Sequence, residues 1–150
     1  MKNKFLLIAV FASSIAFASN TNISEKEVTE AQKKWAECIV EIGKASKETA
    51  NSRALDCINT LYAYDDTGVL FKPTKATQKQ FREDKESALS YFVKGKIEED
   101  TGFALQPWSN VRFDNSKTII DSDSAISMGN YYFTDANTNK EIKVEYIGLS

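Results

Sequence analysis

Apolar residues recur at helical spacing through the first half of the chain. The longest stripe covers residues 28–45 in steps of three and four, which places its members on one helix face. Ser24 stands three residues before Glu27, the spacing of a capping box, so we expect a long amphipathic helix to begin there. A shorter helix is predicted from about Ser52, and a third over residues 77–93.

Alternation replaces helical spacing in the second half. Residues 108–113, 124–134 and 141–147 are predicted strands, separated by turns at 114–116 and 135–139. A brief strand is also predicted at 69–71, before Pro73. Helices that precede antiparallel strands indicate an α+β domain. We expect N-terminal helices packed on a curved antiparallel β-sheet, in a cone-like, cystatin-like α+β roll.

The N-terminus has the pattern of an export signal. Lys2 and Lys4 precede an uncharged stretch at 5–17, which is too short to span a bilayer as a helix, and Ala16 and Ala18 flank Phe17. We therefore predict a cleaved signal peptide over residues 1–18 and a single domain over residues 19–150. The mature domain should be periplasmic or secreted, with no membrane association after cleavage.

Composition excludes several classes of function. The chain has no His, so it cannot build a Ser-His-Asp or Cys-His pair, and a zinc site lacks its usual ligands. We expect no metal and no cofactor. The chain has 19 Lys and Arg against 21 Asp and Glu, and the signal peptide removes two lysines, which leaves a mature charge of −4. A mildly acidic domain is a poor fit to nucleic acid.

The two cysteines, Cys38 and Cys57, have two interpretations. An even number of cysteines in an exported chain favours a disulfide. Both residues also fall on apolar faces of predicted helices, where a free Cys behaves as a small core residue. The sequence alone leaves both open.

Several stretches of the mature chain carry a family resemblance. They are Glu30-Ala31-Gln32 with Trp35, then residues 60–65, 69–75, 88–93, 102–108, 111–113, 129–135 and 144–146. In this order they resemble exported SnoaL-like bacterial proteins of the nuclear transport factor 2-like superfamily, a fold shared with the association domain of calcium/calmodulin-dependent kinase II. The resemblance implies a pocket between the concave sheet face and the long helix.

The C-terminal end departs from that resemblance. Similar proteins usually continue past the strand at 144–146 into a hairpin whose last strand carries paired His residues, whereas this sequence ends at Ser150. We therefore expect a sheet that lacks its last strands and has an unpaired edge. Together with the resemblance, this edge predicts a homo-oligomer, most simply a dimer.

Candidate ligand-binding residues come from the strand pattern. Trp108, Asn110 and Arg112 are predicted to share a face, where they would stack on and pair with an anionic ligand. The alternative is a rim Arg over an aromatic core residue. Asn130 and Tyr132 share one face of the next strand and are further candidates.

Four other features have weaker chemical interpretations. Tyr64 is expected at the cavity mouth, with a turn or cap role as the alternative. Glu145 is a weak candidate for a general base, with an outward-facing charge as the alternative. The segment 72–75, Lys-Pro-Thr-Lys, would contact a phosphate or carboxylate or simply be solvated. The acidic run 98–100 is interpreted as a solvated turn.

These features favour an exported small-molecule-binding or assembly domain with no assigned activity. The alternative is a cavity enzyme, of hydrolase, isomerase or dehydratase type, that uses a carboxylate or a Tyr in place of His.

Overall fold

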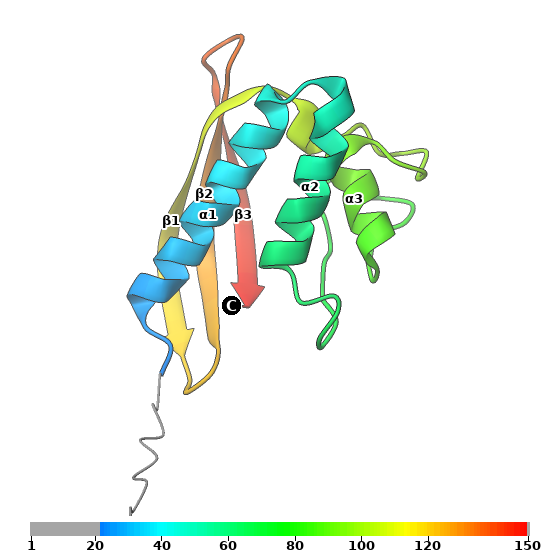
Figure 1. The fold of residues 1–150 in the computed structure, drawn as a ribbon. Helices are drawn as coiled ribbons and strands as arrows, with labels where there is room; N and C mark the ends of the chain where they lie inside the picture. The colour runs from blue at the N-terminus through cyan, green and yellow to red at the C-terminus, as the bar shows by residue number, and fades with distance from the viewer. Residues whose placement is uncertain (1–21, 150) are drawn as a thin grey trace, which may run out of the picture.

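The computed structural model describes residues 22–149, and the predicted signal peptide at 1–18 lies outside them (Figure 1). The elements are α1 (Glu25–Lys44), α2 (Lys47–Leu61), α3 (Lys85–Val93), the short 3-10 helix η1 (Phe103–Leu105), β1 (Trp108–Ile120), β2 (Ala125–Asp135) and β3 (Glu141–Leu149). The predicted α+β class is confirmed. No helix within this range is both long and apolar enough to cross a membrane.

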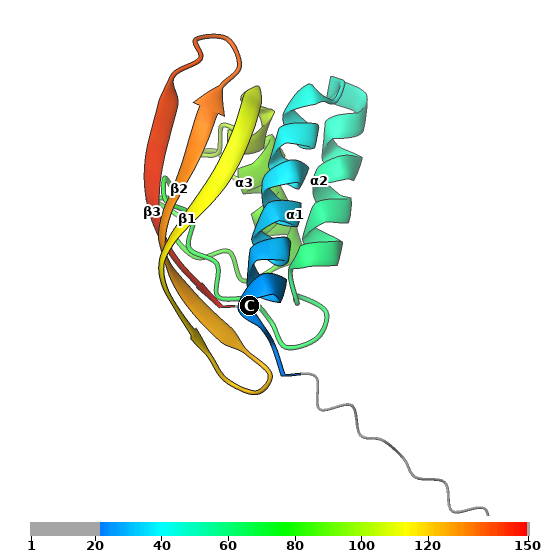
Figure 2. The ribbon, with the colours of Figure 1, turned by 90° about the vertical axis from the view of Figure 1, so that its left-hand side faces the viewer.

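The strands form one antiparallel sheet in the order β1-β2-β3. Figure 2 shows the sheet bending around α1, with α2 packed beside α1 and α3 farther along the same side. The three helices therefore lie on one side of the sheet, with α1 directly against it, and within residues 22–149 no helix covers the other face. We call these the inner and outer faces.

The start of α1 follows the predicted capping box. The Ser24 backbone N–H donates to the Glu27 carboxylate at 2.8 Å, and the Glu27 N–H donates to the Ser24 hydroxyl at 3.3 Å. These bonds satisfy donors that a helix leaves free at its N-terminus. Along the same helix Ile39 and Ile42 are fully buried, so the predicted apolar stripe does face the core.

The core joins the helices to the inner face of the sheet. Ile58 of α2 and Phe92 of α3 are buried with Phe133 of β2 in one cluster. A disulfide between Cys38 and Cys57 links α1 to α2, with the two Cα atoms 6.2 Å apart. The structure thus decides between the two interpretations of the cysteines in favour of the bridge.

In the middle of the chain, two predicted helices are present but begin at other residues, and one predicted strand is absent. α2 begins at Lys47, earlier than predicted, and residues 69–71 form no strand. Residues 77–84 are not helical, since the N–H groups of Thr77, Gln78 and Lys79 all donate to the Glu99 carboxylate instead. α3 begins only at Lys85, after Asp84 as its N-cap.

The predicted turn at 114–116 was also wrong. β1 continues through these residues to Ile120, and the excess length is absorbed by an irregularity in register between Asn115 and Lys117. A β-bulge accommodates an extra residue without ending the strand. The turn at 135–139 is confirmed, because the Asp135 carboxylate accepts the N–H groups of Asn137 and Thr138.

Candidate functional site

The inner face of β2 supplies the floor of the candidate site. Tyr131 is half-buried there, and its ring centroid lies 5.9 Å from Trp35, 5.4 Å from Phe113 and 4.9 Å from Phe133. Aromatic packing on several sides fixes the ring direction, so the phenol group has a defined position.

A second phenol group approaches from α3. Tyr91 packs its ring 5.1 Å from Phe103 and 6.0 Å from Phe71. Burial raises the pKa of Tyr91, and a backbone N–H of Lys75 offsets part of that rise. Burial likewise raises the pKa of Tyr131, and the Thr74 side chain offsets part of it. Phe103, which contacts Tyr91, lies 6.5 Å from Phe133, which contacts Tyr131, so the two phenols belong to one aromatic cluster. We call Tyr91 and Tyr131, together with Thr74 and Lys75, the tyrosine site.

The loop that supplies Thr74 and Lys75 is held at both ends. The Phe71 carbonyl accepts the Arg82 N–H at 2.9 Å, and the Pro73 carbonyl accepts the Ala76 N–H at 3.3 Å. Pro73 and Ala76 are buried, whereas Thr74 and Lys75 between them are exposed. The turn thus anchors its flanks in the core and presents its central residues to solvent.

A hollow of about 440 Å³ opens beside the tyrosine site. Its wall is made of both polar and apolar groups: Lys75, Tyr91, Glu99, Asp100, Thr101, Gly102, Phe103, Leu105, Gln106, Pro107, Trp108 and Asn137. Lys75 and Tyr91 belong to both the hollow and the site. The site is therefore open to small solutes from this side.

The site offers hydrogen-bond donors that carry no charge. Phenols with a raised pKa stay protonated at neutral pH and can donate O–H, as can the Thr74 hydroxyl and the Lys75 N–H. Residues 22–149 contain no group of three or more His, Cys, Asp or Glu side chains placed to hold a metal ion. This arrangement suits a small oxyanion held by hydrogen bonds.

Sequence reasoning placed Trp108, Asn110 and Arg112 on one strand face, and this was wrong. Trp108 is buried on the inner side, while Asn110 and Arg112 are exposed. The register of β1 against β2 shifts between Trp108 and Asn110, so the alternation is reset after the first residue. Trp108 donates its indole N–H to the Phe103 carbonyl at 2.9 Å and lines the hollow.

The other strand candidates lie on the outer face. The Arg112 guanidinium sits 3.9 Å from the centroid of the Tyr132 ring and pairs with Glu141 at 3.1 Å. Asn130 is half-buried opposite Glu145, which is exposed. The structure thus brings Arg112 and Tyr132 together, but away from the helices and the tyrosine site.

Tyr64 lies apart from both groups. Its hydroxyl donates to the Arg82 carbonyl at 2.8 Å, its ring stacks on Tyr62, and burial raises its pKa to about 12. The acidic run was wrongly interpreted as a solvated turn. Asp100 is buried, and Glu99 caps the loop at 77–79.

Sequence reasoning missed Tyr91 and Tyr131 as site residues. Tyr131 alternates with Tyr132, so the pattern offered two faces and no means of choosing the inner one. Tyr91 sits within an apolar helical stretch, where an aromatic residue is typical of core. The usable signal was the Lys-Pro-Thr-Lys segment, which was singled out for anion contact and does supply Thr74 and Lys75.

Comparison with known proteins gives consistent matches. The family model described as "MICAH: Metal-independent carbonic anhydrase" matches residues 26–148. A metal-independent carbonic anhydrase from Nostoc sp. (strain PCC 7120 / SAG 25.82 / UTEX 2576) is 39% identical over 123 residues, which cover 77% of this chain and 60% of that protein. The chain therefore spans 60% of the length of this curated relative.

A solved structure is also similar. It is the crystal structure of the iota-carbonic anhydrase from a cyanobacterium complexed with bicarbonate, which is 36% identical and has a TM-score of 0.81. The match covers 85% of this chain and 82% of that one.

These matches overturn the SnoaL-like and nuclear transport factor 2-like assignment. The function derived from it, a binding or assembly domain without assigned activity, was wrong as well. The error has a physical source, because an order of helices followed by an antiparallel meander is shared by folds that host different chemistries.

Proposed function

Because the chain belongs to the metal-independent carbonic anhydrase family, we propose that its tyrosine site interconverts carbon dioxide and bicarbonate. The observation that carries this proposal is that one aromatic cluster, built on Phe103 and Phe133, holds both Tyr91 and Tyr131. Burial raises the pKa of each phenol, and the Thr74 side chain and the Lys75 N–H act on them. All four groups can donate a hydrogen bond without adding charge.

The reaction joins a water oxygen to the carbon of carbon dioxide. One C=O π electron pair moves onto an oxygen, the product is bicarbonate, and one proton leaves to solvent. Negative charge therefore develops on the oxygens during the attack. Fixed O–H and N–H donors stabilise such charge, since they need no reorientation when it appears.

The site has an apolar side and a solvent-exposed side, and each suits one part of the reaction. The rings of Phe71, Phe103 and Phe133 make apolar contacts to Tyr91 or Tyr131, which suits an uncharged substrate. Thr74 and Lys75 are exposed, so water and the released proton have a direct route. The Lys75 side chain lines the hollow and adds a positive charge that attracts bicarbonate, the substrate of the reverse reaction.

The test measures carbon dioxide hydration by stopped flow with a pH indicator, on protein dialysed against a strong chelator. We expect activity in the wild type and a loss of about hundredfold to thousandfold in Tyr91→Phe and Tyr131→Phe, the magnitude typical of removing one fixed donor that stabilises developing negative charge. Tyr146→Phe is the matched control, because its hydroxyl bonds Gln32 and Asn115 instead. Chelated wild-type protein without activity would refute the proposal.

We also propose that the three-stranded sheet and α1 form the cone-like roll expected from the sequence. The bending of the sheet around α1 in Figure 2 supports it. A crystal structure with a flat sheet would contradict it.

We further propose that the domain works outside the cytoplasm, in the periplasm or medium. Disulfides persist mainly in oxidising compartments, and the Cys38–Cys57 bridge fits such a destination.

A further inference from the structure

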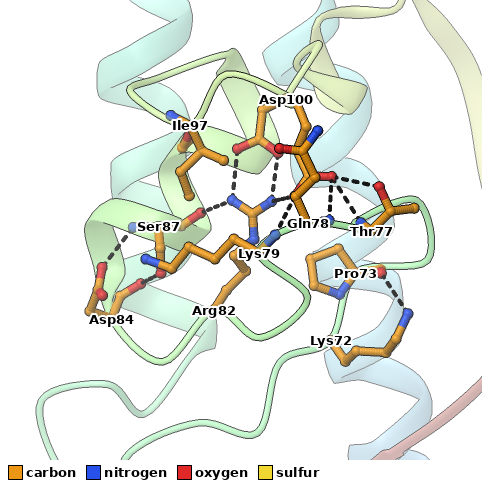
Figure 3. A network of polar contacts seen from close by, with 12 residues as sticks. Lys72, Pro73, Thr77, Gln78, Lys79, Arg82, Asp84, Ser87, Ile97 and Asp100 are labelled. Carbon is orange, nitrogen blue, oxygen red and sulfur yellow. Dashed lines mark hydrogen bonds and ion pairs between the residues drawn. The ribbon is translucent and has the colours of Figure 1, made fainter.

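Arg82 is the most completely buried charged side chain near the tyrosine site. It is 0% exposed and makes two parallel bonds of 2.7 Å to the Asp100 carboxylate. Its guanidinium also donates to the Ser87 carbonyl at 3.1 Å and lies 3.5 Å from Glu99 (Figure 3). The Nε atom has no partner among the described residues.

Arg82 contacts two of the three segments that carry the site, the loop of Thr74 and Lys75 and the helix of Tyr91. Its backbone N–H donates a hydrogen bond to the Phe71 carbonyl, just before the loop that carries Thr74 and Lys75. Its guanidinium carbon lies 5.7 Å from the centroid of the Tyr91 ring, and its bond to Ser87 reaches the first turn of the helix that carries Tyr91. One residue therefore ties the loop of Thr74 and Lys75 to the phenol of Tyr91.

Arg82 also sets the charge of the hollow. Asp100 and Glu99 both line it, and two uncompensated carboxylates would repel an anion. The guanidinium pairs with Asp100 directly, while Glu99 binds three backbone N–H groups at 77–79. Arg82 therefore balances the negative charge of Asp100 in the wall of the hollow through which bicarbonate would enter.

Stability alone gives a weak reason for burying this pair. Desolvation of two ions roughly cancels their attraction, and well-packed apolar side chains of similar size often do as well. The unpartnered Nε atom adds to the cost. The bidentate pair of Arg82 and Asp100 is better explained by a role in fixing the positions of the site residues, because its planar geometry is specific.

We propose that Arg82 is the positioning residue of the tyrosine site. It fixes Tyr91 against the Thr74–Lys75 loop and cancels the charge of Asp100, so that the hollow admits an anion. This inference rests on the proposed function, and it identifies Arg82 as the residue that sets the geometry of the tyrosine site.

The test compares Arg82→Lys, the double variant Arg82→Gln/Asp100→Asn and the wild type. Lysine keeps the charge but cannot form the fork, so the hydration rate should fall about tenfold or more while bicarbonate affinity changes by less than about threefold. Affinity is read from the line broadening of ¹³C-bicarbonate. The double variant has no net charge at positions 82 and 100 and lacks the two parallel hydrogen bonds. It should also show a lower hydration rate with little change in bicarbonate affinity.

Arg53→Lys, an exposed change on α2, is the matched control and should behave as wild type. Thermal unfolding shows that each variant is folded. The double variant, which has no charge at positions 82 and 100 and keeps the three N–H bonds to Glu99, serves if the lysine variant does not fold. Folded variants with wild-type rates would overturn the role of Arg82 and leave the proposed function intact. A wild type that neither binds bicarbonate nor hydrates carbon dioxide would refute the proposed function, and this inference with it.

Discussion

Reduction of the Cys38–Cys57 bridge should lower the free energy of unfolding by about 3 kcal/mol. The cysteines are 19 residues apart in sequence. Closing a loop of this length removes roughly 11 cal/mol/K from the entropy of the unfolded chain, which at 25 °C corresponds to that figure. Core contacts other than the bridge hold both helices in place, α1 against β1 and α2 against α1 and α3, so the constraint acts mainly on the unfolded state.

The same loss can be expressed as a temperature. Unfolding entropy is about 2.1 cal/mol/K per residue, or roughly 0.27 kcal/mol/K for a domain of this size, so the midpoint should fall by about 11 °C. Native packing should change little on reduction. Cys57 is buried and Cys38 is half-buried in apolar surroundings, where free thiols behave as small apolar groups.

The assay is urea unfolding at neutral pH with and without a phosphine reductant. Trp35, three residues before Cys38 on α1, reports the transition by fluorescence. The variant Cys38→Ala/Cys57→Ala is the control, and reductant should not move its transition. Equal free energies for the oxidised and reduced wild type would show that loop entropy is not what the bridge contributes.

Three further outcomes are expected. Hydrogen bonds from the backbone N–H of Gln78 and its neighbours hold the pKa of Glu99 at about 2, below its ordinary 4.5. The lowered pKa of Glu99 adds stability that is fully present above pH 4.5 and is lost as the pH falls towards 2. In Glu99→Gln the free energy of unfolding, measured by denaturant titration, should therefore depend less on pH between 4.5 and 2. On the outer face, Met128 and Ile147 are 50% and 75% exposed, so we propose that a second copy covers them. Light scattering at tens of micromolar should give a dimer that Met128→Glu dissociates, and a monomeric wild type would exclude this. Export should leave Ser19 at the N-terminus, and mass spectrometry that finds an intact Met1 on periplasmic protein would contradict it.

Local pattern was enough to predict the elements whose determinants are close in sequence. The capping box at Ser24 and the stripe through Ile39 and Ile42 specify α1, because helix ends and faces depend on residues three and four apart. The Asp135 turn is equally local. Together with strand alternation, these signals were sufficient for the α+β class.

The family could not be reached by the same argument. Element order resembled another superfamily, and only matching over residues 26–148 and a similar solved structure corrected it. Neighbouring positions such as Tyr131 and Tyr132 carry equal local signals. Which one enters the site depends on the side of the sheet that the helices cover.

The sequence by itself determined the helix stripe, the last turn and the alternation of β2. The tertiary structure decided what required distant partners. Glu99 takes the N–H groups at 77–79 and so prevents the predicted helix there, and the bulge at 115–117 carries β1 through a predicted turn. Thr74, Tyr91 and Tyr131 meet only after folding, since hydrogen bonds and burial act through space while sequence patterns report spacing along the chain.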